Sequence, residues 1–133
     1  MLINCGSSSL KFAILNATTG KTLFSGTAEY LLQGESVANY RLAEGDLQYY
    51  SLGRDATHER TLTALVGFIQ DQQLDESLVA VGHRVVHGGE AFAAPTLITD
   101  EVQAAIEDHV ELAPLHNPPN LLGIRVAREL LPH

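Results

Sequence analysis

The chain has 133 residues, 45% of them hydrophobic and 18% charged, with a formal net charge of −8 at pH 7. This balance is typical of a soluble globular protein, and a domain of this length buries roughly two thirds of its unfolded surface. The shortage of Lys and Arg excludes broad contact with nucleic acid or an anionic membrane surface, because both require a basic face. No membrane span or signal peptide is indicated, so a cytoplasmic protein is expected. Cys5 is the only cysteine, which excludes an intrachain disulfide, and it is expected to be a small packing residue.

Alternation of apolar and polar residues predicts a β-rich first half. Turn residues separate the apolar runs, so neighbouring strands are expected to pair antiparallel. The predicted strands are residues 2–4, 11–15, 22–28, 38–43 and 47–52.

From Asp55 the apolar residues recur at helical spacing, and either Asp55 or Thr57 can cap the first turn of the predicted helix. Residues 78–82 are a short apolar run typical of a buried strand, which Val85 and Val86 would extend.

Two further helices are expected in the last third of the chain. One follows Thr99, and the other has Asn117 as its cap and Pro118 at its first helical position. Antiparallel strands followed by helix, strand, helix and helix predict an α/β or α+β domain, a mixed sheet flanked by helices, without internal repeats.

The segment N-C-G-S-S-S at residues 4–9 lies between two predicted strands and has the features of a phosphate-binding loop. Its small side chains let backbone N–H groups approach a phosphate, and Gly6 permits an unusual φ. Lys11 would add a point charge, and Asn4 could reach a metal ion directly or through its water shell. An ordinary β-turn explains the same residues, so the loop alone does not decide the function.

Two polar segments follow the predicted buried strand. Arg84 lies at the end of that strand within G-H-R-V-V-H-G-G-E, residues 82–90, and its planar fork matches a carboxylate or a phosphoryl group. The segment A-P-L-H-N-P-P-N, residues 113–120, places an apolar residue, a histidine and an amide at a helix entrance. The structural alternatives are a surface ion pair for Arg84 and local capping by His116 or Asn117.

The three segments, in this order and at these separations, resemble the acetate kinase family over essentially the whole chain. Residues 4–12, 82–90 and 113–120 are similar to its N-terminal phosphate loop, its G-H-R-V-V-H-G-G-E segment and its A-P-L-H-N-P-x-N segment. The resemblance implies the actin-like ATPase, or ribonuclease H-like, fold shared with sugar kinases and heat-shock chaperone ATPases, in which two related domains close on a nucleotide. Residues 1–133 would be an incomplete N-terminal domain.

Individual roles are implied by matching position in that family. The residues implied to meet the ATP phosphates are Ser7, Ser8, Ser9 and Lys11. The residue implied to help hold Mg²⁺ is Asn4. Arg84 is implied to be catalytic and to bind the carboxylate of the substrate. Val86 and Leu115 are implied to line the pocket for its methyl group. His116 and Asn117 are implied to lie near the reacting phosphoryl group.

The implied reaction is reversible transfer of the γ-phosphoryl group of ATP to acetate, giving acetyl phosphate and ADP. An ionised acetate oxygen needs no general base, so catalysis depends on positioning and charge neutralisation. The family's F-D-T-A-F-H segment, with a catalytic aspartate, and its second domain are absent from these residues. The fragment alone is therefore expected to be inactive, and the longer parent is expected to be a homodimer formed largely by the other domain.

Three alternatives remain. Propionate and butyrate kinases of the same family differ in the pocket for the alkyl chain, which Val86 and Leu115 do not settle. A non-catalytic nucleotide-binding module would not need Arg84 together with two apolar pocket residues. A metal site of four histidines is disfavoured, because a spacing of four on a strand creates no shared face; its residues would be His83, His87, His109 and His116.

Overall fold

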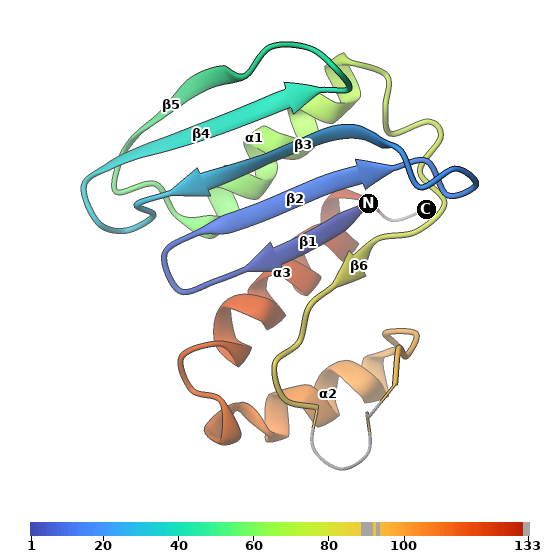
Figure 1. The fold of residues 1–133 in the computed structure, drawn as a ribbon. Coiled ribbons are helices and arrows are strands. Elements are labelled where there is room, and N and C mark those ends of the chain that lie inside the picture. Colours follow the sequence, from blue (N-terminus) through green and yellow to red (C-terminus); the bar gives the residue numbers. More distant parts are fainter. Residues whose placement is uncertain (89–91, 93, 132–133) are drawn as a thin grey trace.

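The computed structural model of the chain describes residues 1–88, 92 and 94–131. It shows a mixed sheet with helices packed on one face, which confirms the predicted α/β class (Figure 1). Gly89 and Glu90, the last two residues of the second motif, lie outside the described residues. No helix in the described part is long and apolar enough to cross a membrane.

The sheet has six strands in the order β5-β4-β3-β2-β1-β6. All neighbouring strands are antiparallel except β1 and β6, which are parallel, so the five predicted antiparallel strands are confirmed. The strands are β1 (Leu2–Cys5), β2 (Leu10–Leu15), β3 (Thr22–Glu29), β4 (Glu35–Leu42), β5 (Gln48–Arg54) and β6 (Gly82–His83).

The predicted buried strand at residues 78–82 is wrong over most of its length. Only its last residue belongs to β6, and Val79 is 85% exposed. The segment runs along the edge of the described sheet, where nothing covers its outer side. Val85 and Val86 do not extend the strand either, because the Val86 N–H donates to a side chain of the last helix instead of to a neighbouring strand.

The first helix, α1 (His58–Asp71), begins where the change of hydrophobic period predicts it. Of the two candidate caps, Thr57 is confirmed, since its side chain accepts from the Arg60 N–H at 3.1 Å. Asp55 is not the cap; its carboxylate instead accepts from the Gly34 N–H at 2.7 Å. The inward face of α1 covers the sheet with apolar side chains, among them Leu62, Leu65, Val66 and Ile69.

The C-terminal third forms α2 (Asp100–Asp108), the short 3₁₀ helix η1 (Val110–Leu112) and α3 (Asn117–Leu130). Thr99 caps α2, as predicted. The prediction that Asn117 caps α3 is wrong, because Asn117 is already helical and His116 takes the cap position without a side-chain bond. The Asn117 side chain bonds instead to the backbone of His87: it accepts from the His87 N–H and donates to the His87 carbonyl.

Helices α1 and α3 pack against each other and on the same face of the sheet, while α2 packs against α3 beyond the end of β6 (Figure 1). Gly123 lies where α3 packs closely against β1. A Cβ atom on Gly123 would lie 2.6 Å from Cys5 Sγ, which is too close for ordinary van der Waals contact. Because glycine has no Cβ, α3 can pack this close to the end of β1.

The two helix glycines provide a matched test of this packing. Gly123→Ala should lower the free energy of unfolding by about 1–3 kcal/mol, because the new methyl group collides with Cys5. Gly67→Ala, at a position in α1 with no atom within 4 Å of the new Cβ, should raise it by about 0.5–1 kcal/mol through helix propensity. Urea unfolding measures both changes. A stabilised Gly123→Ala variant would contradict the contact.

Candidate functional site

One face of the sheet is left uncovered by the helices, and predicted site residues from three strands meet on it. In β1, Ile3 and Cys5 point into the core, so Asn4 points to the opposite face. The register pairs Asn4 with Lys11 of β2, and the Arg84 N–H, just after β6, donates to the Ile3 carbonyl at 3.2 Å. Continuing this register places Arg84 beside Asn4 on the same face.

These three side chains line a groove of about 460 Å³ across β1, β2 and β6. Among the described residues, its lining includes the cations Lys11 and Arg84 and no carboxylate. The imidazole of the neighbouring His83 lies on the covered face, near Gly123 of α3, where burial lowers its pKa to about 4 and leaves it neutral at pH 7. Within an acidic chain, this groove is a locally positive surface suited to phosphate or carboxylate groups.

The predicted phosphate loop joins β1 to β2 at the end of this groove. The Gly6 N–H donates to the Ser9 carbonyl at 2.8 Å, and the Ser8 carbonyl accepts from the Leu31 N–H at 3.0 Å. Gly6 does not use the unusual φ that glycine permits, since it is not among the glycines with positive φ. A Cβ at this position would lie 3.0 Å from Ser9 Oγ, a tight contact that a turn of the serine side chain would relieve. The exposed Ser7 forms the tip of the loop.

Two buried side chains from different helices hold consecutive carbonyls of this loop. Asn120 of α3 donates from Nδ2 to the Cys5 carbonyl at 2.7 Å, and His58 of α1 bonds through Nε2 to the Gly6 carbonyl at 2.6 Å. Sequence reasoning gave neither residue a role. Asn120 is the last residue of the 113–120 segment, so the sequence did mark its neighbourhood as functional. Nothing in the sequence near His58 indicated a contact with the loop.

The backbone that follows Arg84 is fastened to α3 by asparagines. Asn117, which is fully buried, accepts from the His87 N–H at 3.2 Å and donates to the His87 carbonyl at 2.8 Å. Asn120 accepts from the Val86 N–H at 3.2 Å. The amides of Asn117 and Asn120 are thus engaged with the polypeptide itself, and together they hold the chain two and three residues beyond the arginine.

The remaining predicted substrate residues do not line the groove of Asn4, Lys11 and Arg84. Val86 is 38% exposed, Leu115 is 72% exposed and His116 is exposed at the start of α3. An apolar pocket around a substrate methyl group therefore stays a prediction. Burial raises the pKa of the Cys5 thiol to about 12, so this cysteine is a packing residue rather than a nucleophile.

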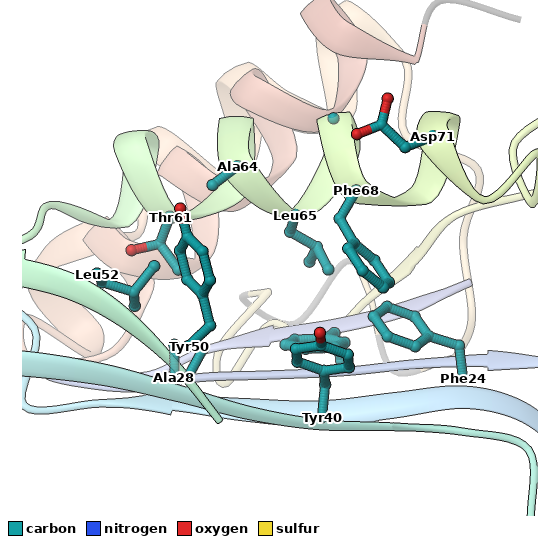
Figure 2. A pocket seen from close by; sticks show the side chains of 13 residues that line it. Phe24, Ala28, Tyr40, Tyr50, Leu52, Thr61, Ala64, Leu65, Phe68 and Asp71 are labelled. Atoms are coloured by element: carbon teal, nitrogen blue, oxygen red, sulfur yellow. The ribbon is translucent and has the colours of Figure 1, made fainter. Parts of the chain in front are cut away.

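A second hollow, of about 330 Å³, lies between α1 and the covered face of the sheet (Figure 2). Figure 2 shows the rings of Phe24, Tyr40 and Phe68 gathered at one end of it, with Leu65 above. The described residues that line the hollow are mainly apolar and include no Lys or Arg. It therefore lacks the charge that a phosphate or carboxylate ligand needs.

A metal ion would find few ligands in the groove. Asn4 offers one neutral oxygen, and the two nearby cations repel a bare divalent ion. Among the described residues no three His, Cys, Asp or Glu side chains are placed to hold one metal ion. The donor set fits Mg²⁺ only as a complex with phosphate oxygens and water, which is how Mg²⁺ is commonly bound.

The family model described as the Acetokinase family matches residues 1–133, the whole chain. This chain belongs to the acetokinase family. The acetate kinases of Mannheimia succiniciproducens and Haemophilus influenzae are 43% and 44% identical to it, and each alignment covers 100% of the chain and 33% of the relative. The chain thus spans about a third of the length of these curated relatives.

Solved structures of the family share the fold. A propionate kinase from Francisella tularensis superposes with a TM-score of 0.91 at 35% identity, over 99% of this chain and 34% of that one. The acetate kinase of Porphyromonas gingivalis gives 0.88 at 35% identity, over 98% and 34%. The mixed sheet of this acetokinase chain is therefore the family's sheet, in keeping with the actin-like ATPase fold.

The depressed pKa of His83 predicts a loss of stability in acid. The unfolded chain takes up a proton on this histidine below about pH 6.5, whereas the folded chain resists protonation down to about 4. Its contribution is therefore present above pH 6.5 and is lost as the pH falls toward 4. His83→Gln should flatten the unfolding free energy over this interval. An NMR titration midpoint for His83 near 6.5 would contradict the burial.

Proposed function

We propose that the protein is an acetate kinase, which reversibly transfers the γ-phosphoryl group of ATP to acetate and gives ADP and acetyl phosphate. The observation that carries this proposal is the groove of Asn4, Lys11 and Arg84 beside a serine-rich loop, in a chain of the acetokinase family. Residues 1–133 would supply part of the N-terminal domain. The remainder would supply the opposing half of the site and most of a homodimer contact, in a cytoplasmic enzyme.

Each of these residues is proposed to contact a different part of the ligands. Ser7, Ser8, Ser9 and Lys11 meet the phosphates of ATP, and Asn4 meets the Mg²⁺ that accompanies them. When bound, Mg²⁺ neutralises charge on the β- and γ-phosphate oxygens. Arg84 binds the carboxylate of acetate and the equatorial oxygens of the transferring group, for which its planar fork is suited.

The reaction needs little proton chemistry from these residues. The ionised carboxylate oxygen forms the new bond to the γ-phosphorus, the bond from that phosphorus to the β-γ bridging oxygen breaks, and ADP leaves with the electron pair. Catalysis then rests on holding the two oxygens in line and on stabilising the charge between them. Lys11 and Arg84 provide the positive charge, and no carboxylate opposes it among the described residues that line the groove.

Propionate kinase is the second candidate. The superposition on the Francisella tularensis propionate kinase, at a TM-score of 0.91, supports it as well as it supports acetate kinase. The choice depends on the room around the alkyl group, to which Val86 and Leu115 are proposed to contribute. Both side chains are exposed in this chain, so the pocket would be completed by the rest of the protein.

Kinetics with acetate, propionate and butyrate decide between these candidates. The complete gene product should give its highest kcat/KM with acetate, because one added methylene in a close-fitting pocket costs on the order of 10-fold or more. A tenfold preference for propionate would replace the first candidate by the second. Binding of ATP without turnover of any of the three acids would indicate a non-catalytic nucleotide-binding module.

Replacement of Arg84 tests the site itself. Arg84→Ala in the complete gene product should lower kcat/KM for acetate on the order of 10²-fold or more, because the charge at the transferring group is lost. Arg84→Lys should recover only part, since an ammonium lacks the bidentate fork. Arg125→Ala is the matched control, because that exposed arginine only pairs with Glu107 at 2.6 Å. Unchanged kinetics in Arg84→Ala would remove Arg84 from the site.

A further inference from the structure

His58 lies far from the groove in sequence, yet its side chain ends at the phosphate loop. It is the first residue of α1 and only 4% exposed, and its Nε2 atom lies 2.6 Å from the Gly6 carbonyl oxygen across 52 residues of chain. A carbonyl oxygen can only accept, so Nε2 must carry the hydrogen and donate it. The contact is therefore a buried hydrogen bond with a defined tautomer.

This bond fixes the direction of the peptide between Gly6 and Ser7. The peptide is trans and planar, so the Ser7 N–H points opposite to the Gly6 carbonyl. The carbonyl points inward to the buried His58, and the Ser7 N–H consequently points outward, where Ser7 is exposed. The loop thus presents a hydrogen-bond donor to the side from which an anion would approach.

Glycine makes this orientation easy to lose. A peptide that follows a glycine rotates with little steric resistance, and rotation would turn the Gly6 carbonyl oxygen outward in place of the Ser7 N–H. An outward carbonyl would repel a phosphate that the N–H would bind. The neighbouring Cys5 carbonyl is held inward in the same way by Asn120 Nδ2, at 2.7 Å. The loop is therefore locked from two helices.

We propose that His58 is a positioning residue of the phosphate loop: its Nε2–H bond to the Gly6 carbonyl keeps the Ser7 N–H directed at the phosphates of the nucleotide. We call this fixed orientation of the Gly6–Ser7 peptide the lock. The identity of the ligand rests on the proposed function, whereas the lock rests only on the hydrogen bond. His58 itself does not touch the substrate, and it acts only through the backbone.

Amide replacements separate the hydrogen bond from the rest of the side chain. The amide nitrogen of a glutamine reaches the place of Nε2, whereas that of an asparagine reaches only the place of Nδ1. In the complete gene product, His58→Asn and His58→Leu should raise KM for ATP on the order of 10-fold, with KM for acetate unchanged within about twofold. His58→Gln should restore KM for ATP to within about threefold of the parent value.

Thr61→Val is the matched control for stability. Thr61 is buried one turn further along α1, and its hydroxyl donates to the Thr57 carbonyl at 2.8 Å, so its loss weakens the same helix without touching the loop. KM for ATP should stay at the parent value in this variant. If Thr61→Val raises KM for ATP as His58→Asn does, the effect belongs to helix stability and the proposed lock is wrong.

A second readout does not require catalysis. In the ¹⁵N-labelled 133-residue chain, inorganic tripolyphosphate should shift the amide signal of Ser7, and the shift should be lost in His58→Asn and kept in His58→Gln. If the complete gene product shows no kinase activity but the Ser7 shifts follow this pattern, the proposed function is wrong and the lock is supported. Equal Ser7 shifts in the parent chain and the asparagine variant would reject the lock.

The unsubstituted chain provides a test that cannot fail through misfolding. Imidazole ¹⁵N shifts should show His58 with its hydrogen on Nε2. A hydrogen on Nδ1 alone would overturn the proposal, because Nε2 could then not donate to Gly6. If the asparagine and leucine variants do not fold, the glutamine variant decides together with the tautomer: a KM for ATP raised tenfold or more in His58→Gln would also overturn it.

Discussion

The close packing of α3 against the end of β1 is the contact on which the candidate site depends. Gly123 allows the approach, since any larger residue would meet Cys5 Sγ. At that separation Asn120 reaches both the Cys5 carbonyl and the Val86 N–H, and Asn117 reaches both backbone groups of His87. One helix thereby holds both the start of the loop after β1 and the chain beyond Arg84.

The two faces of the sheet carry different kinds of side chain. Alternate residues of β1 and β2 point inward to α1 and α3 and form the core, and the residues between them carry Asn4 and Lys11 on the open face. Placing the cations there avoids the large cost of burying charge. The amide of Asn120 and the imidazole of His58, whose hydrogen bonds can be satisfied in the interior, hold the loop from the buried side.

Charge and geometry together narrow the chemistry of the open groove. In a chain with a net charge of −8, two cations lie together near a serine-rich loop, with no carboxylate among the described lining residues, which suits ligands that carry phosphate and carboxylate groups. The apolar hollow under α1 lacks such charge and lies on the other face of the sheet. Among the described residues no group of acidic side chains is placed to hold a metal ion, and the chain spans about a third of the length of the curated relatives.

The sequence by itself determined the five antiparallel strands, the first helix with its Thr57 cap, and the family, because periodicity, capping and short motifs are local signals. Tertiary structure decided the rest. Residues 78–82 are apolar enough for a buried strand but lie mostly outside β6 at the sheet edge, and Asn117, placed to cap α3, turns to residue 87. His58 meets Gly6 across 52 residues. Such partners lie far away in sequence, and only packing brings them within hydrogen-bond distance.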